Sequence, residues 1–193
     1  MSGSRARPGN ILRGVTLLAR GKAEGLSQFA SSPQALLSSL APLIAFPLVG
    51  FLLTVIGRPG AAASGLADLL GALCAALAPP VLSYEFARHW HREAGWLRYA
   101  TALDWCQWVV PLLAALLLTV IYPIVASALP ARGALGIVAL GIVAYALWLH
   151  WFIARHGLML SGRQAALLVF LVNLGTGLLA IGPRLLMLAR AGG

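Results

Sequence analysis

The sequence predicts an all-α fold, a polytopic membrane bundle of about five transmembrane helices with an amphipathic interfacial helix at its N-terminus. Hydrophobic residues make up 60% of the 193 residues and charged residues only 10%. The mean hydropathy is +0.88, so the chain has more apolar surface than a soluble domain of this length can cover. The net charge is +9, and the basic residues lie mainly between apolar runs. This placement is typical of residues that set the orientation of a membrane protein, and it indicates no nucleic-acid partner.

The N-terminal residues 1–32 are expected to form a cytoplasmic arm, followed by a transmembrane domain over 33–188 and a short tail over 189–193. In the arm, apolar residues recur at helical spacing, which predicts a helix lying on the membrane surface. These residues are Ile11, Leu12, Val15, Leu18 and Ala19. Ser32 is placed to cap the next helix, with Pro33 at its first position.

The five spans are predicted at residues 36–56, 66–86, 102–126, 134–153 and 164–181. The first, second and third spans contain prolines, which predict kinks. The second carries Ala67, Gly71 and Ala75 at four-residue steps, a stripe that lets a neighbouring helix approach closely. Residues 85–98 are the most polar stretch and are expected to be a loop. The fifth span is expected to give way at Gly182-Pro183.

Lys and Arg counts between the spans predict the orientation, because cytoplasmic loops of membrane proteins are enriched in these residues. Ten lie in the arm and the second and fourth loops, against four on the opposite side. The prediction is a multi-pass protein of the bacterial inner membrane with its N-terminus in the cytoplasm and its C-terminus in the periplasm. The residues expected to face anionic lipid headgroups are Arg13, Arg20, Lys22, Arg88, Arg92 and Arg98.

Four polar residues near the cytoplasmic ends of the spans form a candidate intramembrane cluster: Asp104, Gln107, His150 and Asn173. A charged side chain at this depth in the membrane is costly, so it is expected either to be neutralised by another group or to serve a function. Asp104 is interpreted chiefly as an interface acid neutralised by Arg88, Arg98 or His150, with a proton or cation site as the alternative. At the opposite membrane face, Asp68 and Arg184 are predicted to form an ion pair.

His150 is expected to make an orienting hydrogen bond to Asp104 or to a backbone carbonyl. Ligation of a pigment or a haem is the weaker alternative, since the sequence has no second histidine at matching depth. Glu85 and His89, one helical turn apart, could hold a metal together with His91 and His156. The arginines among them oppose cation binding, so no metal is expected.

No catalytic residues and no cofactor are expected. The chain has five acidic residues on both sides of the membrane, and it lacks a nucleophile triad, a phosphate-binding glycine loop and paired catalytic carboxylates. These features favour a non-enzymatic protein.

The order of elements resembles bacterial members of the Yip1 superfamily. The resemblance rests on residues 29–36 (FASSPQAL) leading into 43–47 (LIAFP), on 99–102 (YATA) before Pro111, and on 145–148 (YALW). Eukaryotic members of that superfamily are membrane-trafficking factors. The resemblance therefore implies a membrane-organising or scaffold role without catalytic residues.

Two functions follow as hypotheses. The first is a Yip1-like organiser or an accessory subunit that contacts other membrane protein subunits or forms a homo-oligomer, as its small-residue stripes indicate. The alternative is a small transporter or channel component with proline-broken helices around a path lined by Asp104, Gln107, His150 and Asn173.

Overall fold

The computed structural model describes residues 9–58, 60 and 62–191, and the side chains of the last helix only as far as residue 180. All regular secondary structure in these residues is helical, and five helical segments are long and apolar enough to cross a membrane. The prediction of an all-α protein with five candidate spans is therefore confirmed.

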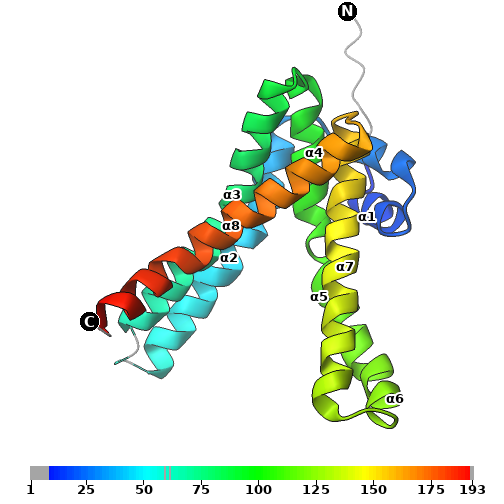
Figure 1. Cartoon of the computed structure of the whole chain (residues 1–193). Coiled ribbons are helices and arrows are strands. Elements are labelled where there is room, and N and C mark those ends of the chain that lie inside the picture. The colour runs from blue at the N-terminus through cyan, green and yellow to red at the C-terminus, as the bar shows by residue number, and fades with distance from the viewer. Residues whose placement is uncertain (1–8, 59, 61, 192–193) are drawn as a thin grey trace, which may run out of the picture.

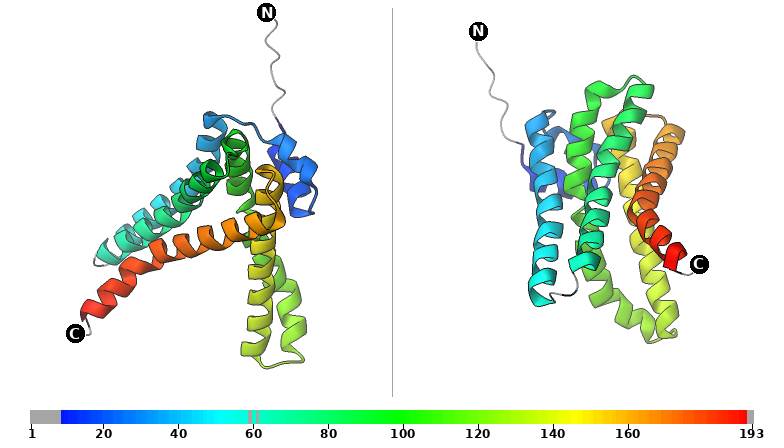
Figure 2. Two further views of the ribbon diagram at one scale, coloured as in Figure 1. Left: turned by 45° about the horizontal axis from the view of Figure 1, so that its top comes forward. Right: turned by 90° about the vertical axis from the view of Figure 1, so that its left-hand side faces the viewer.

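The helices form two diverging arms that meet at one end, which we call the apex (Figures 1 and 2). One arm consists of α2 (Pro33–Gly57), α3 (Ala62–His89) and α8 (Gly162–Ala191). The other contains α5 (Val109–Leu116), the π-helical turn η3 (Leu117–Ile121), α6 (Tyr122–Ala126) and α7 (Ala131–Gly157). At the apex lie α1 (Ile11–Ala19), the 3-10 helix η1 (Ala23–Gln28) and α4 (Glu93–Cys106).

The first transmembrane helix begins where the sequence predicts. The Ser32 hydroxyl accepts a hydrogen bond from the backbone N–H of Ala35 at 3.2 Å. Pro33 occupies the first helical position, where its missing N–H needs no partner. Pro42 and Pro47 lie inside α2.

The polar stretch 85–98 is mostly helical, so the prediction of a loop there is wrong. Helix α3 continues to His89 and α4 begins at Glu93. The turn between them uses His91 in the left-handed backbone region, with φ of 54°, and the N–H of Arg92 donates to the carbonyl of Ala87 at 2.7 Å. Charged residues suit exposed helix ends as well as loops, which is why polarity alone misplaced this boundary.

The third span is interrupted, as its prolines predict. Residues Glu93–Ala126 form a 34-residue apolar segment, but α4 ends at Cys106 and α5 starts only at Val109. Pro111 has no N–H to donate to the carbonyl of Gln107, which accepts instead from Val110 at 3.3 Å. The π-helical turn η3 ends shortly before Pro123, which likewise has no N–H for a regular helical hydrogen bond.

The end of the fifth span differs from the prediction. Helix α8 continues through Gly182-Pro183 to Ala191. A single proline removes one backbone hydrogen bond, and an apolar transmembrane helix tolerates this loss.

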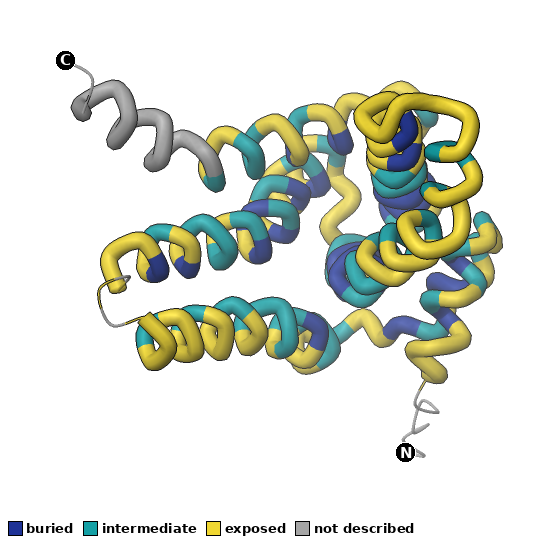
Figure 3. The backbone as a smooth tube through the Cα atoms, turned by 90° about the horizontal axis from the view of Figure 1, so that it is seen from below, coloured by how far each residue is buried: buried dark blue, intermediate teal, exposed yellow. Residues whose placement is uncertain are grey.

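The hydrophobic core lies at the apex, and the arm ends are largely exposed (Figure 3). The core includes Leu18, Leu26 and Phe29 from the N-terminal arm, packed with residues of α4, α7 and α8. The Tyr145 hydroxyl donates to the carbonyl of Ala19 at 2.9 Å, which joins α7 to the end of α1. The N-terminal arm is thus packed against the bundle through these three side chains and the Ala19 carbonyl.

Helices α3 and α8 pack closely at Gly71, one residue of the predicted small-residue stripe. A Cβ atom at Gly71 would lie 3.5 Å from the backbone oxygen of Ala180, so the two backbones approach closely there. We expect Gly71→Leu to lower the free energy of unfolding by about 1–3 kcal/mol, because the larger side chain must push the helices apart.

The measurement is thermal or SDS-induced unfolding of the detergent-purified protein. Gly136→Leu is the matched control, since a Cβ at Gly136 meets nothing within 4 Å. Equal stability of the two variants would contradict close packing of α3 on α8 at this position.

Candidate functional site

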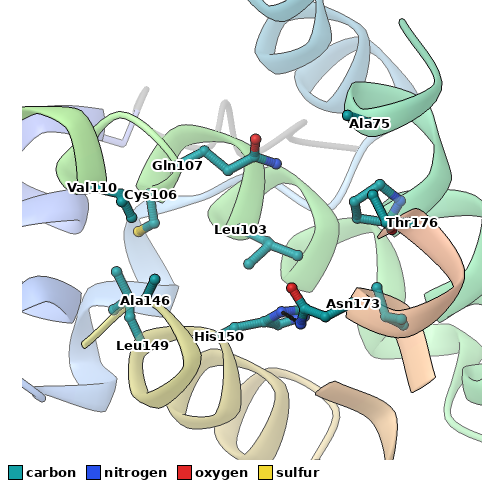
Figure 4. Close-up of a pocket in the computed structure, with 12 residues that line it drawn as sticks. Ala75, Leu103, Cys106, Gln107, Val110, Ala146, Leu149, His150, Asn173 and Thr176 are labelled. Carbon is teal, nitrogen blue, oxygen red and sulfur yellow. Dashed lines mark hydrogen bonds between the residues drawn. The ribbon is translucent and has the colours of Figure 1, made fainter. Parts of the chain in front are cut away.

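A polar pocket lies where the two arms meet, between α3, α4, α5, α7 and α8; we call it the fork pocket. Its volume is about 250 Å³, and its polar lining consists of Gln107, His150, Asn173 and Thr176. Apolar residues such as Leu103, Val110 and Leu149 form the remaining wall. Figure 4 shows Gln107 on the opposite side of the pocket from His150 and Asn173.

His150 is buried, with 9% of its surface exposed, and it links three helices through hydrogen bonds. Its Nε2 lies 2.9 Å from the Tyr99 hydroxyl on α4. Its Nδ1 lies 3.3 Å from Nδ2 of Asn173 on α8. The amide nitrogen of Asn173 only donates, so Nδ1 of His150 is the acceptor and Nε2 carries the hydrogen given to Tyr99. Both ring nitrogens are engaged by protein groups.

The partners of His150 differ from those the sequence predicts, which were Asp104 or a backbone carbonyl. Tyr99 was missed as a partner because a single tyrosine between the polar stretch 85–98 and the predicted third span gives no indication of what its hydroxyl contacts. It is fully buried, and a buried phenol needs a hydrogen-bond partner.

Asp104 lies outside the fork pocket, so the four predicted cluster residues do not form one site. Its carboxyl group is completely buried, and Oδ2 lies 3.0 Å from the Ser39 hydroxyl of α2, whose one hydrogen is shared between Asp104 and the carbonyl of Leu36 at 2.8 Å. The Oδ1 atom has no hydrogen-bond partner among the described residues. Gln107 follows Asp104 by three residues and keeps helical backbone angles, but its side chain lines the fork pocket while that of Asp104 contacts α2.

The predicted neutralising arginines do not reach Asp104. Arg88 pairs with Glu85 at 2.7 Å, and both side chains are more than half exposed. The other basic residues predicted to lie at the membrane surface are also exposed: Arg13, Arg20, Lys22, Arg92 and Arg98. The prediction of an Asp68–Arg184 ion pair cannot be placed, since the Arg184 side chain lies outside the described residues.

In the described part of the chain, no three His, Cys, Asp or Glu side chains lie close enough to share a metal ion. Nδ1 of His156 donates to the backbone carbonyl of Phe152 at 2.9 Å. Glu85 lines one pocket with His89 and His91, but its carboxylate is paired with Arg88.

Comparison with family models, with curated proteins and with solved structures finds no match to this chain. The chemistry of the fork pocket is therefore inferred from its own residues. An imidazole, two amides and a hydroxyl, all uncharged in this arrangement, can accept and donate hydrogen bonds.

Removal of the Ser39 hydroxyl should destabilise the protein, because it leaves the buried carboxylate of Asp104 without a hydrogen-bond donor. We expect Ser39→Ala to lower the free energy of unfolding by about 1–3 kcal/mol. The matched control is Ser38→Ala, since the exposed Ser38 hydroxyl donates only to the carbonyl of Ala35. Unfolding of both detergent-purified variants measures the difference, and a neutral Ser39→Ala would contradict the assignment.

Proposed function

We propose that this chain is a non-enzymatic protein of the bacterial inner membrane that works by lateral contact with other membrane proteins or with a second copy of itself. It would act as a Yip1-like organiser or an accessory subunit. The observation that carries this proposal is the separation of the two arms. Their main mutual contact is that of α7 with α8, and away from the apex they diverge (Figure 2).

The arms expose large apolar side chains that a folded helical bundle of this size would otherwise bury against a neighbour. Leu53 on α2 is 64% exposed and Leu140 on α7 is 70% exposed. In the bilayer such faces contact either lipid or another helix, and van der Waals packing against a second protein favours helices with accessible small residues. Gly136 and Gly141 on α7 meet no atom within 4 Å of a Cβ position, which leaves their face open to close approach.

The orientation is part of the proposal. The exposed basic residues of α1, of the α3–α4 turn and of α4 all belong to segments at the apex (Figure 1). The positive-inside tendency supports an apex at the cytoplasmic surface, with α1 resting on anionic headgroups. Helix α1 exposes both an apolar and a basic side chain: Leu12 is 79% exposed, and the neighbouring Arg13 is also exposed.

A second function is favoured by one observation, the polar lining of the fork pocket. Gln107, His150 and Asn173 share this cavity, as a small transporter or channel component would require. Asp104 is directed to Ser39 instead. A transporter that works alone and a lateral-contact protein differ in whether the arms have a protein neighbour in the membrane.

Photo-crosslinking tests for that neighbour. A benzophenone amino acid replaces Leu53 or Leu140 in cells that express the full chain, and Met159 serves as the control because it is 76% exposed but lies in the turn between α7 and α8. We expect discrete crosslinked protein products from both arm positions and none from Met159. Products equal at all three positions, or monomer alone at both arm positions, would contradict the proposal and leave the transporter as the better reading.

Reporter fusions test the orientation. We expect alkaline phosphatase fused after residue 193 to be active and a cytoplasm-dependent fluorescent protein at the same position to be dark, because five spans place the ends on opposite sides. The same two reporters fused at the N-terminus should give the reverse pattern. A cytoplasmic C-terminus would overturn the assignment of five membrane crossings.

A further inference from the structure

The polar groups of the fork pocket are not all used by the protein. The orientation of the Asn173 amide is set by two contacts of its nitrogen, which donates to the carbonyl of Val169 at 2.7 Å and lies 3.3 Å from Nδ1 of His150. A carbonyl can only accept, so the nitrogen must face it. The oxygen therefore points away from the imidazole into the pocket, as Figure 4 shows.

Thr176, one helical turn beyond Asn173 on α8, supplies a second unused group. Its Oγ1 is buried and has no hydrogen-bond partner among the described residues, and its side chain lines the fork pocket. Serine and threonine in transmembrane helices commonly donate to a backbone carbonyl of the preceding turn. An unpartnered buried hydroxyl is costly in apolar surroundings, by about 1–3 kcal/mol.

Gln107 supplies the third group from the opposite wall. It sits in the break between α4 and α5, and its side-chain amide makes no hydrogen bond with the described residues. The pocket thus offers three free groups: the amide oxygen of Asn173, the hydroxyl of Thr176, and both the oxygen and the nitrogen of the Gln107 amide. The first two lie on α8, and Gln107 lies on the opposite wall (Figure 4).

The ligand that fits this lining is uncharged. No Asp, Glu, Lys or Arg lines the pocket. Asp104 lies on α4, but its side chain contacts Ser39 of α2 and does not line the pocket. Transfer of an unpaired charge into such a site is far more costly than transfer of a hydrogen-bonded neutral group. The lining offers both donors and acceptors, which suits hydroxyl or carbonyl groups.

The ligand also has an apolar part. The rest of the pocket wall is aliphatic, with Leu103, Val110 and Val172 among its residues, and the pocket lies at the fork between the two membrane-spanning arms. A volume of about 250 Å³ is below the range of about 300–1,000 Å³ that holds a whole drug-sized ligand. The pocket therefore accommodates the headgroup of an amphiphile, and a longer apolar tail of the same molecule must lie outside the pocket, between the two arms.

We propose that the fork pocket binds the uncharged, hydrogen-bonding headgroup of a neutral amphiphile through Gln107, Asn173 and Thr176, with the apolar tail of that molecule lying between the arms. Two membrane components share this chemistry, an acylglycerol with its hydroxyl and ester groups and an isoprenoid quinone with its ring carbonyls. This inference goes beyond the proposed lateral-contact function and does not depend on it.

Ligand-dependent thermal stability tests the proposal, because a ligand that binds only the folded state raises the unfolding midpoint. The protein is the full chain in mild detergent, and the loss of far-ultraviolet circular dichroism on heating reports unfolding. A thiol reporter at Cys106 is avoided because Cys106 itself lines the fork pocket. The probes are dioleoylglycerol and a short-chain ubiquinone. The charged controls are oleic acid and dioleoylphosphatidic acid.

We expect a saturable rise of the midpoint by about 5 °C with at least one neutral probe and no saturable rise with the charged lipids. A response to dioleoylglycerol alone assigns the acylglycerol, and a response to the quinone alone assigns the ring headgroup. A response to both supports the shared chemistry. No saturable response to either, or an equal response to the charged lipids, overturns the proposal.

Two variants connect the response to the pocket. Thr176→Val and Gln107→Met preserve shape and break no hydrogen bond within the described structure, so both should fold in the absence of ligand. The midpoint should be unchanged for Gln107→Met and higher for Thr176→Val, which removes an unpartnered buried hydroxyl. We expect each to weaken binding about five- to tenfold. Thr119→Val is the control, since Thr119 lies on η3 and donates to the carbonyl of Ala115. Variants that bind as tightly as this control overturn the assignment to the fork pocket, and the crosslinking result is unaffected in either case.

Discussion

Tyr99, His150 and Asn173 make the hydrogen bonds on which the arrangement of the arms depends. They join α4, α7 and α8 at the point where the arms converge. Within a membrane-spanning segment, water is scarce, so each of these polar groups must find a protein partner at a fixed place. Apolar contacts have no such direction. The chain of three side chains therefore fixes how far α7 and α8 can rotate or slide relative to α4, and with them the position of the fork pocket between the arms.

The packing around this point explains why the molecule is compact at one end and open at the other. The buried core consists of residues from the N-terminal arm, α4, the end of α7 and the start of α8, all at the apex. Farther from the apex, α3 and α8 remain close because Gly71 lets their backbones approach. No comparable contact joins that arm to α7 in the described residues beyond the apex. The two arms are thus tightly packed within themselves and loosely connected to each other, which suits contact with further membrane components.

Much of the fold follows from local patterns in the sequence. Length and apolarity predict the five spans, and the Ser32-Pro33 pair predicts the start of the first. The extent of α3, α4 and α8 could not be predicted in the same way, because charged residues at a helix end and a proline within a helix are each compatible with helix or turn. The partners at the site were harder still. Nothing in the sequence marks Ser39 or Tyr99 as a partner. Ser39 lies 65 residues from Asp104 and Tyr99 lies 51 residues from His150, and only packing of α2 and α7 against α4 brings each pair together.

The failure of the four-residue cluster has a physical consequence for the site. Asp104 and Gln107 are three residues apart, a spacing that places side chains on one face of a continuous helix. Here Gln107 keeps helical backbone angles, and its N–H donates to the carbonyl of Leu103 at 3.0 Å, so the backbone is continuous past Asp104. The two side chains nevertheless have different surroundings, because the carboxyl group of Asp104 meets the Ser39 hydroxyl of α2 while the amide of Gln107 lines the pocket. An acid in the pocket would favour cations or basic groups. Packing of Asp104 against α2 keeps that acid out of the cavity, and the lining that remains contains no Asp, Glu, Lys or Arg.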